Sequence, residues 1–294
     1  MATEAHLGPE RVLENMMSGV AFLLGGISKE ECQQYLLGIG IGVPGVVSLD
    51  GGTVSYPPNL PGWTVIRVGD RIREKFKDAY GFPKPVSVEN DANVAALGEA
   101  AFGAGKAFSD FIMITLGTGV GGGIIINRKI YRGSTGAAGE IGHITIDYRS
   151  DTVHAGIRGT IEGLIGQRQL TAYAKDLARK NPSSILHTLC QNNLDSLDPK
   201  LLANAAEQND SVALAVWSWV GEVLGAGLGT AVSLFDIRKF VVGGGVSGAW
   251  AFLHQPTLEQ VKRFTLPPMQ DGLEIVRAEL GNSAGVMGAA ALCM

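Results

Sequence analysis

The sequence contains few of the residues that characterise secreted, metal-clustered or nucleic-acid-binding proteins. It has 3 cysteines, Cys32, Cys190 and Cys293, far apart in the chain. This spacing excludes a disulfide framework and a cysteine zinc knuckle, and it indicates a reducing compartment. Lys and Arg total 24 against 28 Asp and Glu, a net charge of −4, so a basic surface for phosphate backbones is not expected. We therefore expect no nucleic-acid partner.

Targeting and membrane signals are equally sparse. The N-terminal segment carries Glu4, Glu10 and Glu14 where a signal peptide would be basic and then apolar. The longest apolar run, residues 111–126, is shorter than the roughly 20 residues that span a bilayer, and its centre is mostly glycine. That run predicts a strand, a turn and a second strand. We expect a cytoplasmic protein without a membrane partner.

Glycine, in contrast, is abundant, with 41 residues clustered beside apolar segments. Apolar runs at 36–43, 111–117 and 239–245 predict buried strands that lead into turns. Three prolines in YPPNLPGW, residues 56–63, predict an ordered loop there. Helices are expected over 8–23, 68–77, 93–101, 161–179, 201–207 and 211–234. The alternation of strands and helices predicts an α/β fold with largely parallel sheets.

Two glycine-rich loops are candidate phosphate-binding sites. LGTGVGGG (116–123) leaves backbone amides open to an anion and adds the hydroxyl of Thr118. A tight hairpin turn explains this loop equally well. VVGGGVSGAW (241–250) repeats the order of apolar strand, glycine turn and small residues. Two such loops in one chain favour two walls of a nucleotide site.

The segment VENDANVAALGE (88–99) places polar residues between a short strand and an Ala-rich helix. The carboxylate of Asp91, at the strand end, suits a general base that accepts a proton from a hydroxyl. Asp is also a favoured N-cap residue, so a purely structural role is an alternative. Glu89, Asn90 and Asn93 add groups suited to a polyhydroxylated ligand. Both roles of Asp91 stay open at this point.

A second polar group comes from GAAGEIGH (136–143) and from Glu162. Glu140 and His143 are three residues apart, so a helical turn would put them on one face. Small residues around them leave room for a ligand, although a structural Glu–His pair is the plainer explanation. Glu162 is expected near a helix start, where a carboxylate also interacts favourably with the helix dipole.

These motifs occur in an order that resembles the ROK family of sugar kinases, the bacterial glucokinase group of the actin-like ATPase superfamily. The resemblance rests on ENDAN, LGTGVGGG, GAAGEIGH, GGGVSGA and the terminal NSAGVMGAA, and it extends from about Thr3 to the C-terminus. It implies a ribonuclease H-like fold of two lobes, residues 1–105 with 282–294 and residues 106–281. It also implies a homodimer.

The resemblance further implies phosphorylation of a hexose, glucose at its 6-hydroxyl, with ATP and Mg²⁺. The implied roles are Asp91 as catalytic base, Asn90, Glu140, His143 and Glu162 on the sugar hydroxyls, Thr118 and Gly119 near the phosphates, and Gly243, Gly244 and Gly245 beside the adenosine. Kinases of N-acetylmannosamine, N-acetylglucosamine and fructose use closely similar sets, so these sugars are alternatives. A catalytically impaired sugar-binding protein is another. A sugar-sensing repressor of the family is less expected, since those proteins carry an N-terminal helix-turn-helix domain that this sequence lacks.

The sequence departs from the family pattern at the zinc site. In many members the histidine matching His143 binds zinc with three cysteines in the pattern CxCGxxGCxE. Here the stretch reads VHAGIRGTIE, with Val153, Ala155 and Thr160 at the cysteine positions. Their side chains cannot replace thiolates, and His154 as a second ligand would leave a tetrahedral site incomplete. We expect no zinc and no other metal bound by these residues.

The second departure concerns the phosphate hairpin DxGGT with which the family opens, whose Asp serves Mg²⁺. The printed sequence does not supply it, so we expect an N-terminally incomplete first lobe and little kinase activity unless an upstream segment carries the motif. LDGGT (49–53) has no spacer between Asp and Gly, and it lies between GVPGVV and the proline-rich loop. We therefore interpret LDGGT as a β-turn.

Overall fold

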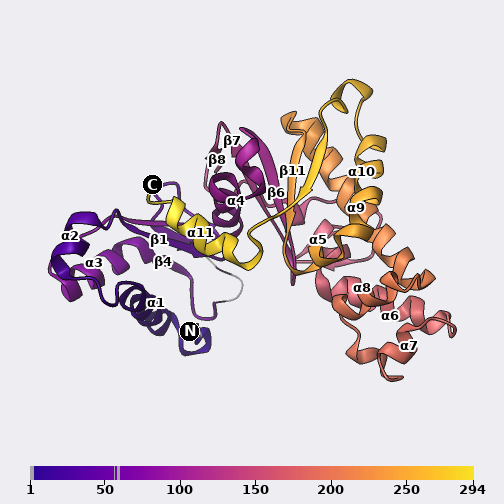
Figure 1. Cartoon of the computed structure of the whole chain (residues 1–294), viewed down its shortest axis with the longest axis horizontal. Helices are drawn as coiled ribbons and strands as arrows, with labels where there is room; N and C mark the ends of the chain where they lie inside the picture. The colour runs from indigo at the N-terminus through magenta and orange to yellow at the C-terminus, as the bar shows by residue number, and fades with distance from the viewer. Residues whose placement is uncertain (1–2, 56, 58–59) are drawn as a thin grey trace. The chain divides into compact units, whose positions relative to one another are not determined.

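The computed structural model describes residues 3–55, 57 and 60–294 (Figure 1). The chain divides into two compact units. Unit 1 comprises Met1–Lys106, Gly123–Gly139 and Asn282–Met294, and unit 2 comprises Ala107–Gly122 and Glu140–Gly281. Helices and strands are mixed along the chain, as the predicted α/β class requires. The predicted class is confirmed.

Unit 1 contains two small sheets and the helices around them. Strands β1 (Ile39–Val43) and β5 (Val86–Asn90) pair in parallel, and β5 leads directly into α4 (Asp91–Phe102). The antiparallel sheet consists of β2 (Val46–Val47), β3 (Thr53–Ser55) and β4 (Val65–Arg67). The other helices of its first segment are η1 (Ala5–Leu7), α1 (Pro9–Leu23), α2 (Lys29–Tyr35) and α3 (Val68–Tyr80). Leu13, Val54, Ile72 and Phe76 are fully buried in the core that these elements share.

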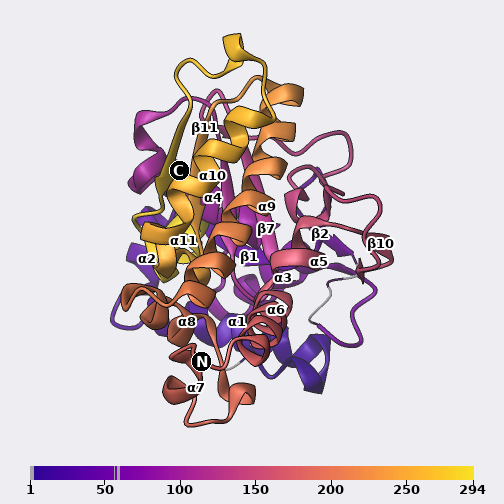
Figure 2. The same cartoon turned by 90° about the vertical axis from the view of Figure 1, so that its right-hand side faces the viewer.

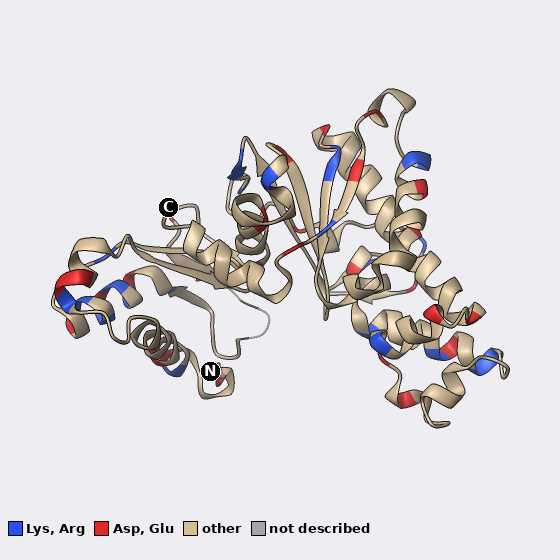
Figure 3. Ribbon diagram, in the orientation of Figure 1, with Lys and Arg blue, Asp and Glu red and all other residues tan. Residues whose placement is uncertain are grey.

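Helix α11 (Ala284–Ala291) packs on α4 and β1 of the same unit through small residues. A Cβ on Gly288 would lie 1.7 Å from the carbonyl oxygen of Val94, and one on Gly40 would lie 1.8 Å from that of Ala289. No charged residue interrupts this helix (Figure 3). The close backbone approach therefore requires glycine at these contacts.

Unit 2 is built on a parallel sheet. β12 (Glu274–Arg277), β11 (Lys239–Gly243) and β6 (Phe111–Leu116) are consecutive parallel neighbours. β6 and β11 are almost wholly buried, as expected for parallel strands covered on both faces. β7 (Val120–Ile126) is the next strand in order, and its end continues into unit 1, where it pairs with β8 (Lys129–Ile130).

The longest helix of unit 2 is α9 (Ser211–Phe235), which packs side by side with α10 (Trp250–Arg263) (Figure 2). Among the described helices, α9 alone is long and apolar enough to cross a membrane, but 72% of its apolar window is buried inside the protein. Such burial is typical of a core helix. The remaining helical elements after residue 103 are η2 (Ala104–Ala107), η3 (Ile141–His143), α5 (Ile161–Ile165), α6 (Gln167–Lys180), α7 (Leu186–Leu189), η4 (Leu194–Ser196), α8 (Pro199–Glu207), η5 (Gly245–Ala249), η6 (Pro267–Met269) and η7 (Gly281–Ser283).

Several sequence predictions need correction. The helix expected over 161–179 is divided into α5 and α6, because Gly166 has an extended ψ of 149° between them. The strand expected from residue 36 begins at Ile39, since Leu36 closes α2. Helix α10, with Pro256 in its interior, was not predicted. The expected lobe boundaries stay a prediction; compact unit 1 also includes residues 123–139, in which Arg132 forms an ion pair with Glu89 of β5.

The segment LDGGT lies in the turn between β2 and β3, as interpreted from the sequence. The amide of Gly51 donates to the carbonyl oxygen of Ser48 at 2.8 Å, and the amide of Ser48 donates to that of Thr53 at 2.9 Å. Of the neighbouring proline-rich loop, residues 56, 58 and 59 lie outside the described residues. The expectation of an ordered loop there stays a prediction.

Candidate active site

In unit 1, Asn90 and Asp91 lie where β5 ends and α4 begins. Asn90 Oδ1 accepts hydrogen bonds from the backbone amides of Ala92 and Asn93 at 2.9 and 3.2 Å. Asn90, not Asp91, is therefore the N-cap of α4. Asp91 Oδ1 accepts a hydrogen bond from the amide of Ala92 at 2.9 Å, and its side chain is exposed. The capping explanation for Asp91 is wrong, and its carboxylate is accessible to a ligand.

The pKa of the Asp91 carboxyl is raised by its surroundings. Desolvation by the surrounding protein is the main cause, and the hydrogen bond from the amide of Ala92 offsets part of it. The side chain keeps some contact with solvent while protein atoms displace much of its hydration. A raised pKa makes a carboxylate a stronger base, which suits proton abstraction from a hydroxyl.

A buried polar network holds the β5–α4 junction. Glu89 is 1% exposed, forms an ion pair with Arg132, and accepts a hydrogen bond from Asn93 Nδ2 at 3.1 Å. Ion pairing and hydrogen bonding compensate the desolvation of a buried carboxylate. Asn90 Nδ2 adds a hydrogen bond to the carbonyl oxygen of Gly45 at 3.1 Å. Asp91 thus follows a segment of unit 1 whose backbone and side chains are held by several hydrogen bonds and an ion pair.

In unit 2, the predicted sugar ligands lie around the short turn η3. His143 Nε2 lies 3.7 Å from Glu140 Oε2, so these two side chains share one face, as their spacing predicts. The ring of His143 stacks on that of His154 with centroids 6.4 Å apart and planes 12° apart. His154 Nε2 lies 2.6 Å from Glu162 Oε1. His154 therefore links Glu162 to the Glu140–His143 pair.

Glu162 also contacts the first glycine loop. It lies in the first turn of α5, and its Oε2 accepts a hydrogen bond from the amide of Val120 at 2.6 Å. A Cβ on Gly119 would lie 2.3 Å from the same oxygen, so a larger residue would displace the carboxylate. Thr118 is exposed in the tight turn that joins β6 to β7. The loop is thus a tight turn and, at the same time, one side of a polar site.

The second glycine loop leaves the sheet beside the first. Gly243 is the register partner of Thr115, so β6 and β11 both end at this edge. Ligands of open parallel α/β sheets bind at the carboxyl edge. Gly244 has a φ of +86°, and a Cβ there would lie 2.2 Å from the carbonyl oxygen of Leu116. The two loops therefore touch, as the hypothesis of two walls requires.

A cavity of about 400 Å³ opens beside Gly245. Helix α8 forms one wall and η5 the other; the lining residues include Lys200, Asn204, Glu207, Gly245, Val246 and Ala249. Its volume lies in the range of small-molecule sites, and its mixture of apolar and amide groups suits a planar heterocycle. The sequence analysis did not assign α8 to a site. No motif marks these residues, and they reach the glycine loop only through the tertiary structure.

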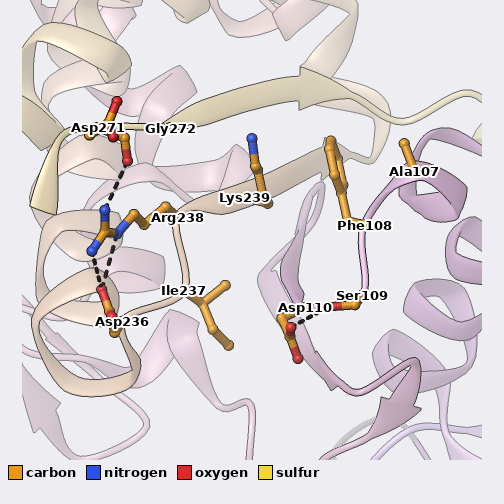
Figure 4. A pocket seen from close by; sticks show the side chains of 10 residues that line it. All are labelled: Ala107, Phe108, Ser109, Asp110, Asp236, Ile237, Arg238, Lys239, Asp271 and Gly272. Atoms are coloured by element: carbon orange, nitrogen blue, oxygen red, sulfur yellow. Dashed lines mark hydrogen bonds and ion pairs between the residues drawn. The ribbon is translucent and has the colours of Figure 1, made fainter.

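A different cavity, of about 380 Å³, lies at the opposite end of β11 near Lys239 (Figure 4). Both of its cationic side chains are already in ion pairs. Arg238 contacts Asp236 at 2.9 Å, and Lys239 contacts Glu274 at 2.8 Å. The cavity lies at the amino end of β11, whereas the glycine turn follows its carboxyl end, so we do not assign it to the active site.

The residues at the family's zinc position do not fit a zinc ion. Thr160 is fully buried, and its Oγ1 accepts a hydrogen bond from the amide of Gly163 at 3.0 Å as the N-cap of α5. Val153 and Ala155 carry no metal-binding atom in their side chains. Across residues 3–55, 57 and 60–294, no three His, Cys, Asp or Glu side chains are placed to hold a metal. The side chains at the family's three cysteine positions therefore cannot supply the thiolate ligands of a zinc site.

Comparison with known proteins identifies the family. The glucokinase of Halalkalibacterium halodurans is 37% identical over 254 residues, which cover 86% of this chain and 74% of that protein. The xylose repressor of Caldicellulosiruptor bescii is 31% identical over 87% of this chain and 62% of the repressor. The structure of a ROK family glucokinase from Streptomyces griseus, in complex with glucose and AMPPNP, matches with a TM-score of 0.80 and 35% identity over 97% of this chain and 88% of that one.

The structural match extends to the architecture, so the fold is the actin-like ATPase fold of the ROK sugar kinases. The family model, described as the ROK family, matches residues 2–294. The match covers nearly the whole chain and agrees with the order of motifs read from the sequence. This chain belongs to the ROK family.

Proposed function

We propose that this protein transfers the γ-phosphoryl group of ATP to a hexose, and that the hexose is glucose. One observation carries the proposal. The carboxylate of Glu162 contacts both the Glu140–His143–His154 cluster and the amide of Val120 in the glycine loop. Groups suited to sugar hydroxyls therefore lie beside groups suited to phosphate oxygens within unit 2. The likeness to glucokinases supports the choice of reaction and of glucose.

The sugar-binding groups are Asn90, Glu140, His143 and Glu162. Carboxylates accept hydrogen bonds from hydroxyls, and an ionised carboxylate offers about four acceptor positions. Two positions of Glu162 are occupied by His154 and Val120, so others remain for a ligand. Glu140 keeps 52% of its side chain exposed. Most of its surface is therefore open to a sugar.

The nucleotide would lie along the two glycine loops. Thr118 and the backbone amide of Gly119 would approach the phosphates, and Gly243, Gly244 and Gly245 would lie beside the adenosine. The cavity between α8 and η5 would hold the adenine. When bound with ATP, Mg²⁺ would supply positive charge that stabilises the phosphate oxygens.

Asp91 would act as the general base. The 6-hydroxyl oxygen attacks the γ-phosphorus, its proton passes to a carboxylate oxygen of Asp91, and the bond from phosphorus to the ADP oxygen breaks. Phosphoryl transfer needs little covalent chemistry from the protein, so positioning and electrostatic stabilisation supply most of the rate. The raised pKa of Asp91 favours proton uptake at that moment. We further propose, from the family resemblance, a cytoplasmic homodimer.

The test is a coupled assay in which glucose 6-phosphate formed from glucose and ATP reduces NADP⁺ through its dehydrogenase. Glucose should be the best substrate in a panel with N-acetylmannosamine, N-acetylglucosamine and fructose. E140Q should raise the KM for glucose by about tenfold or more, because a charged hydrogen bond is worth about 1.5–3 kcal/mol. E259Q, which changes an exposed carboxylate on α10, is the control and should leave the KM unchanged.

A sugar sensor is the second candidate, favoured by the likeness to the xylose repressor. Calorimetry of sugar binding, compared with turnover of the same sugar in the coupled assay, distinguishes a sensor from a kinase. Binding of a sugar without turnover, also in a form extended upstream through an in-frame DxGGT, would contradict the kinase and support the sensor. Turnover of another hexose in preference to glucose would retain the kinase and correct its substrate.

A further inference from the structure

The segment that replaces the family's zinc loop is a small hairpin with a histidine at its centre. β9 (Val153–His154) pairs with β10 (Ile157–Arg158), and the turn residues Ala155 and Gly156 have φ of +48° and +78°. Positive φ at both positions is the signature of a tight two-residue hairpin turn. The backbone pairing of β9 with β10 therefore closes the hairpin.

The histidine of this hairpin contacts the sugar-binding cluster directly. His154 Nε2 lies 2.6 Å from Glu162 Oε1, and the side chains of His154 and Glu162 are 36% and 18% exposed. An ionised carboxylate only accepts hydrogen bonds, so His154 Nε2 must carry the donated proton. The amide of Val120 occupies the other oxygen of Glu162. The two contacts together fix the plane of the Glu162 carboxylate.

The same ring also supports His143. The two imidazoles stack nearly in parallel, and within the described residues His143 Nδ1 is buried without a hydrogen-bond partner. The parallel ring of His154 and the carboxylate of Glu140, whose Oε2 lies 3.7 Å from His143 Nε2, both restrict the orientation of the His143 ring. His154 thus contacts Glu162 and stacks with His143, two of the predicted sugar ligands.

We propose that His154 is a positioning residue that orients Glu162 and His143 for the sugar hydroxyls, in place of the metal that organises this region in many relatives. The inference rests on the proposed function, because it treats those two residues as sugar ligands. Without His154, the hydrogen bond from Val120 is the one polar contact of Glu162 left among the described residues, and the carboxylate can rotate about it. Sugar affinity should then fall while nucleotide binding, which uses the glycine loops and the α8 cavity, changes little.

The first experiment measures sugar binding and kinetics on the full chain. H154A should raise both the Kd of glucose, measured by calorimetry without nucleotide, and its KM by about tenfold or more, with the KM for ATP within about twofold. H154Q should restore most of the affinity, because its amide can donate to Glu162 Oε1. H6A, at an exposed histidine of η1, is the matched control and should behave as the wild type.

The second experiment tests the pair itself. In a double-mutant cycle, H154A added to E162Q should cost much less glucose affinity than H154A alone, because the interaction is already lost. The same cycle read by denaturant unfolding needs no sugar. If the two substitutions are coupled in their effect on the unfolding free energy but the protein binds no hexose, the His154–Glu162 interaction is real. The proposed function is then wrong.

Three results would overturn the positioning role. One is a glucose Kd unchanged in H154A. Another is equal loss of glucose and ATP affinity in H154A with no rescue by H154Q, which a general structural defect would produce. The third is a stoichiometric metal whose removal by chelation weakens glucose binding as much as H154A does, because His154 would then be a metal ligand.

Discussion

Replacement of Asp91 by Asn should separate catalysis from stability. A general base contributes about 10²–10⁴ to a rate, so turnover should fall at least about a hundredfold, a loss of about 2.7 kcal/mol of transition-state stabilisation. The fold should not weaken in parallel. Asn90 provides the N-cap of α4, so D91N leaves intact an interaction that is usually worth about 0.5–2 kcal/mol.

The effect of D91N on stability follows from the direction of the pKa shift. A carboxylate in the first helical turn gains about 0.3–1 kcal/mol from the helix dipole, which Asn would lose. The raised pKa of Asp91 means that desolvation outweighs this gain and that folding disfavours the ionised form. The stabilisation from the protonated form is full below the unfolded pKa of about 3.9 and is lost as pH rises through the folded pKa. D91N should therefore equal or exceed the wild type in unfolding free energy at neutral pH.

The assay combines the coupled kinase reaction with denaturant unfolding across pH. Wild-type kcat/KM should fall as pH decreases through the raised pKa of Asp91, and glucose binding by D91N should persist. Asp70 offers a matched control, because it is also an aspartate in a first helical turn, that of α3; D70N should leave turnover unchanged. A less than tenfold loss of turnover in D91N would refute its role as base. If D91N loses both turnover and a large part of its unfolding free energy, the prediction that Asp91 acts in catalysis and not in stability is wrong.

Three further predictions concern the loops. Metal analysis should find no stoichiometric zinc, and chelators should leave the thermal midpoint unchanged; one zinc per chain would contradict the donor chemistry at Thr160 and its neighbours. G244A should raise the KM for ATP or abolish activity, because its Cβ would lie 2.2 Å from the Leu116 oxygen, whereas G245A, with open space around it, should be mild. A155G should raise the unfolding free energy by about 1 kcal/mol, because it removes a side chain at positive φ; an unchanged or lower value in denaturant titration would refute the strain.

The sequence was sufficient where function depends on local chemistry. Glycine after a buried apolar strand predicts a turn with open amides, and both glycine loops occur at the ends of β6 and β11. The polar run after β5 predicts a strand-to-helix junction, which the structure contains at Asn90. Residue type left Asp91 as either a helix cap or a general base, and it could not show that the neighbouring Asn90 is the N-cap. The choice depends on backbone geometry at a single residue.

Contacts between distant segments were not predictable from pattern. The α8 wall of the cavity beside η5, with Asn204 and Glu207, has the composition of an ordinary amphipathic helix. Arg132, which is partly exposed, forms an ion pair with the buried Glu89 across 43 residues of sequence. No sequence motif marks α8 as a cavity wall or Arg132 as the partner of Glu89. Only the packing of the chain brings these residues together.

Glu162 shows why a structural and a functional explanation need not compete. Its place in the first turn of α5 agrees with a favourable interaction with the helix dipole. Its two oxygens nevertheless contact His154 and the amide of Val120, which lie on other elements. These two contacts hold the carboxylate in one orientation, while its place in the first turn also suits the helix dipole. Because rigid orientation is also what a sugar ligand requires, the stabilising contacts and the proposed binding role depend on one geometry.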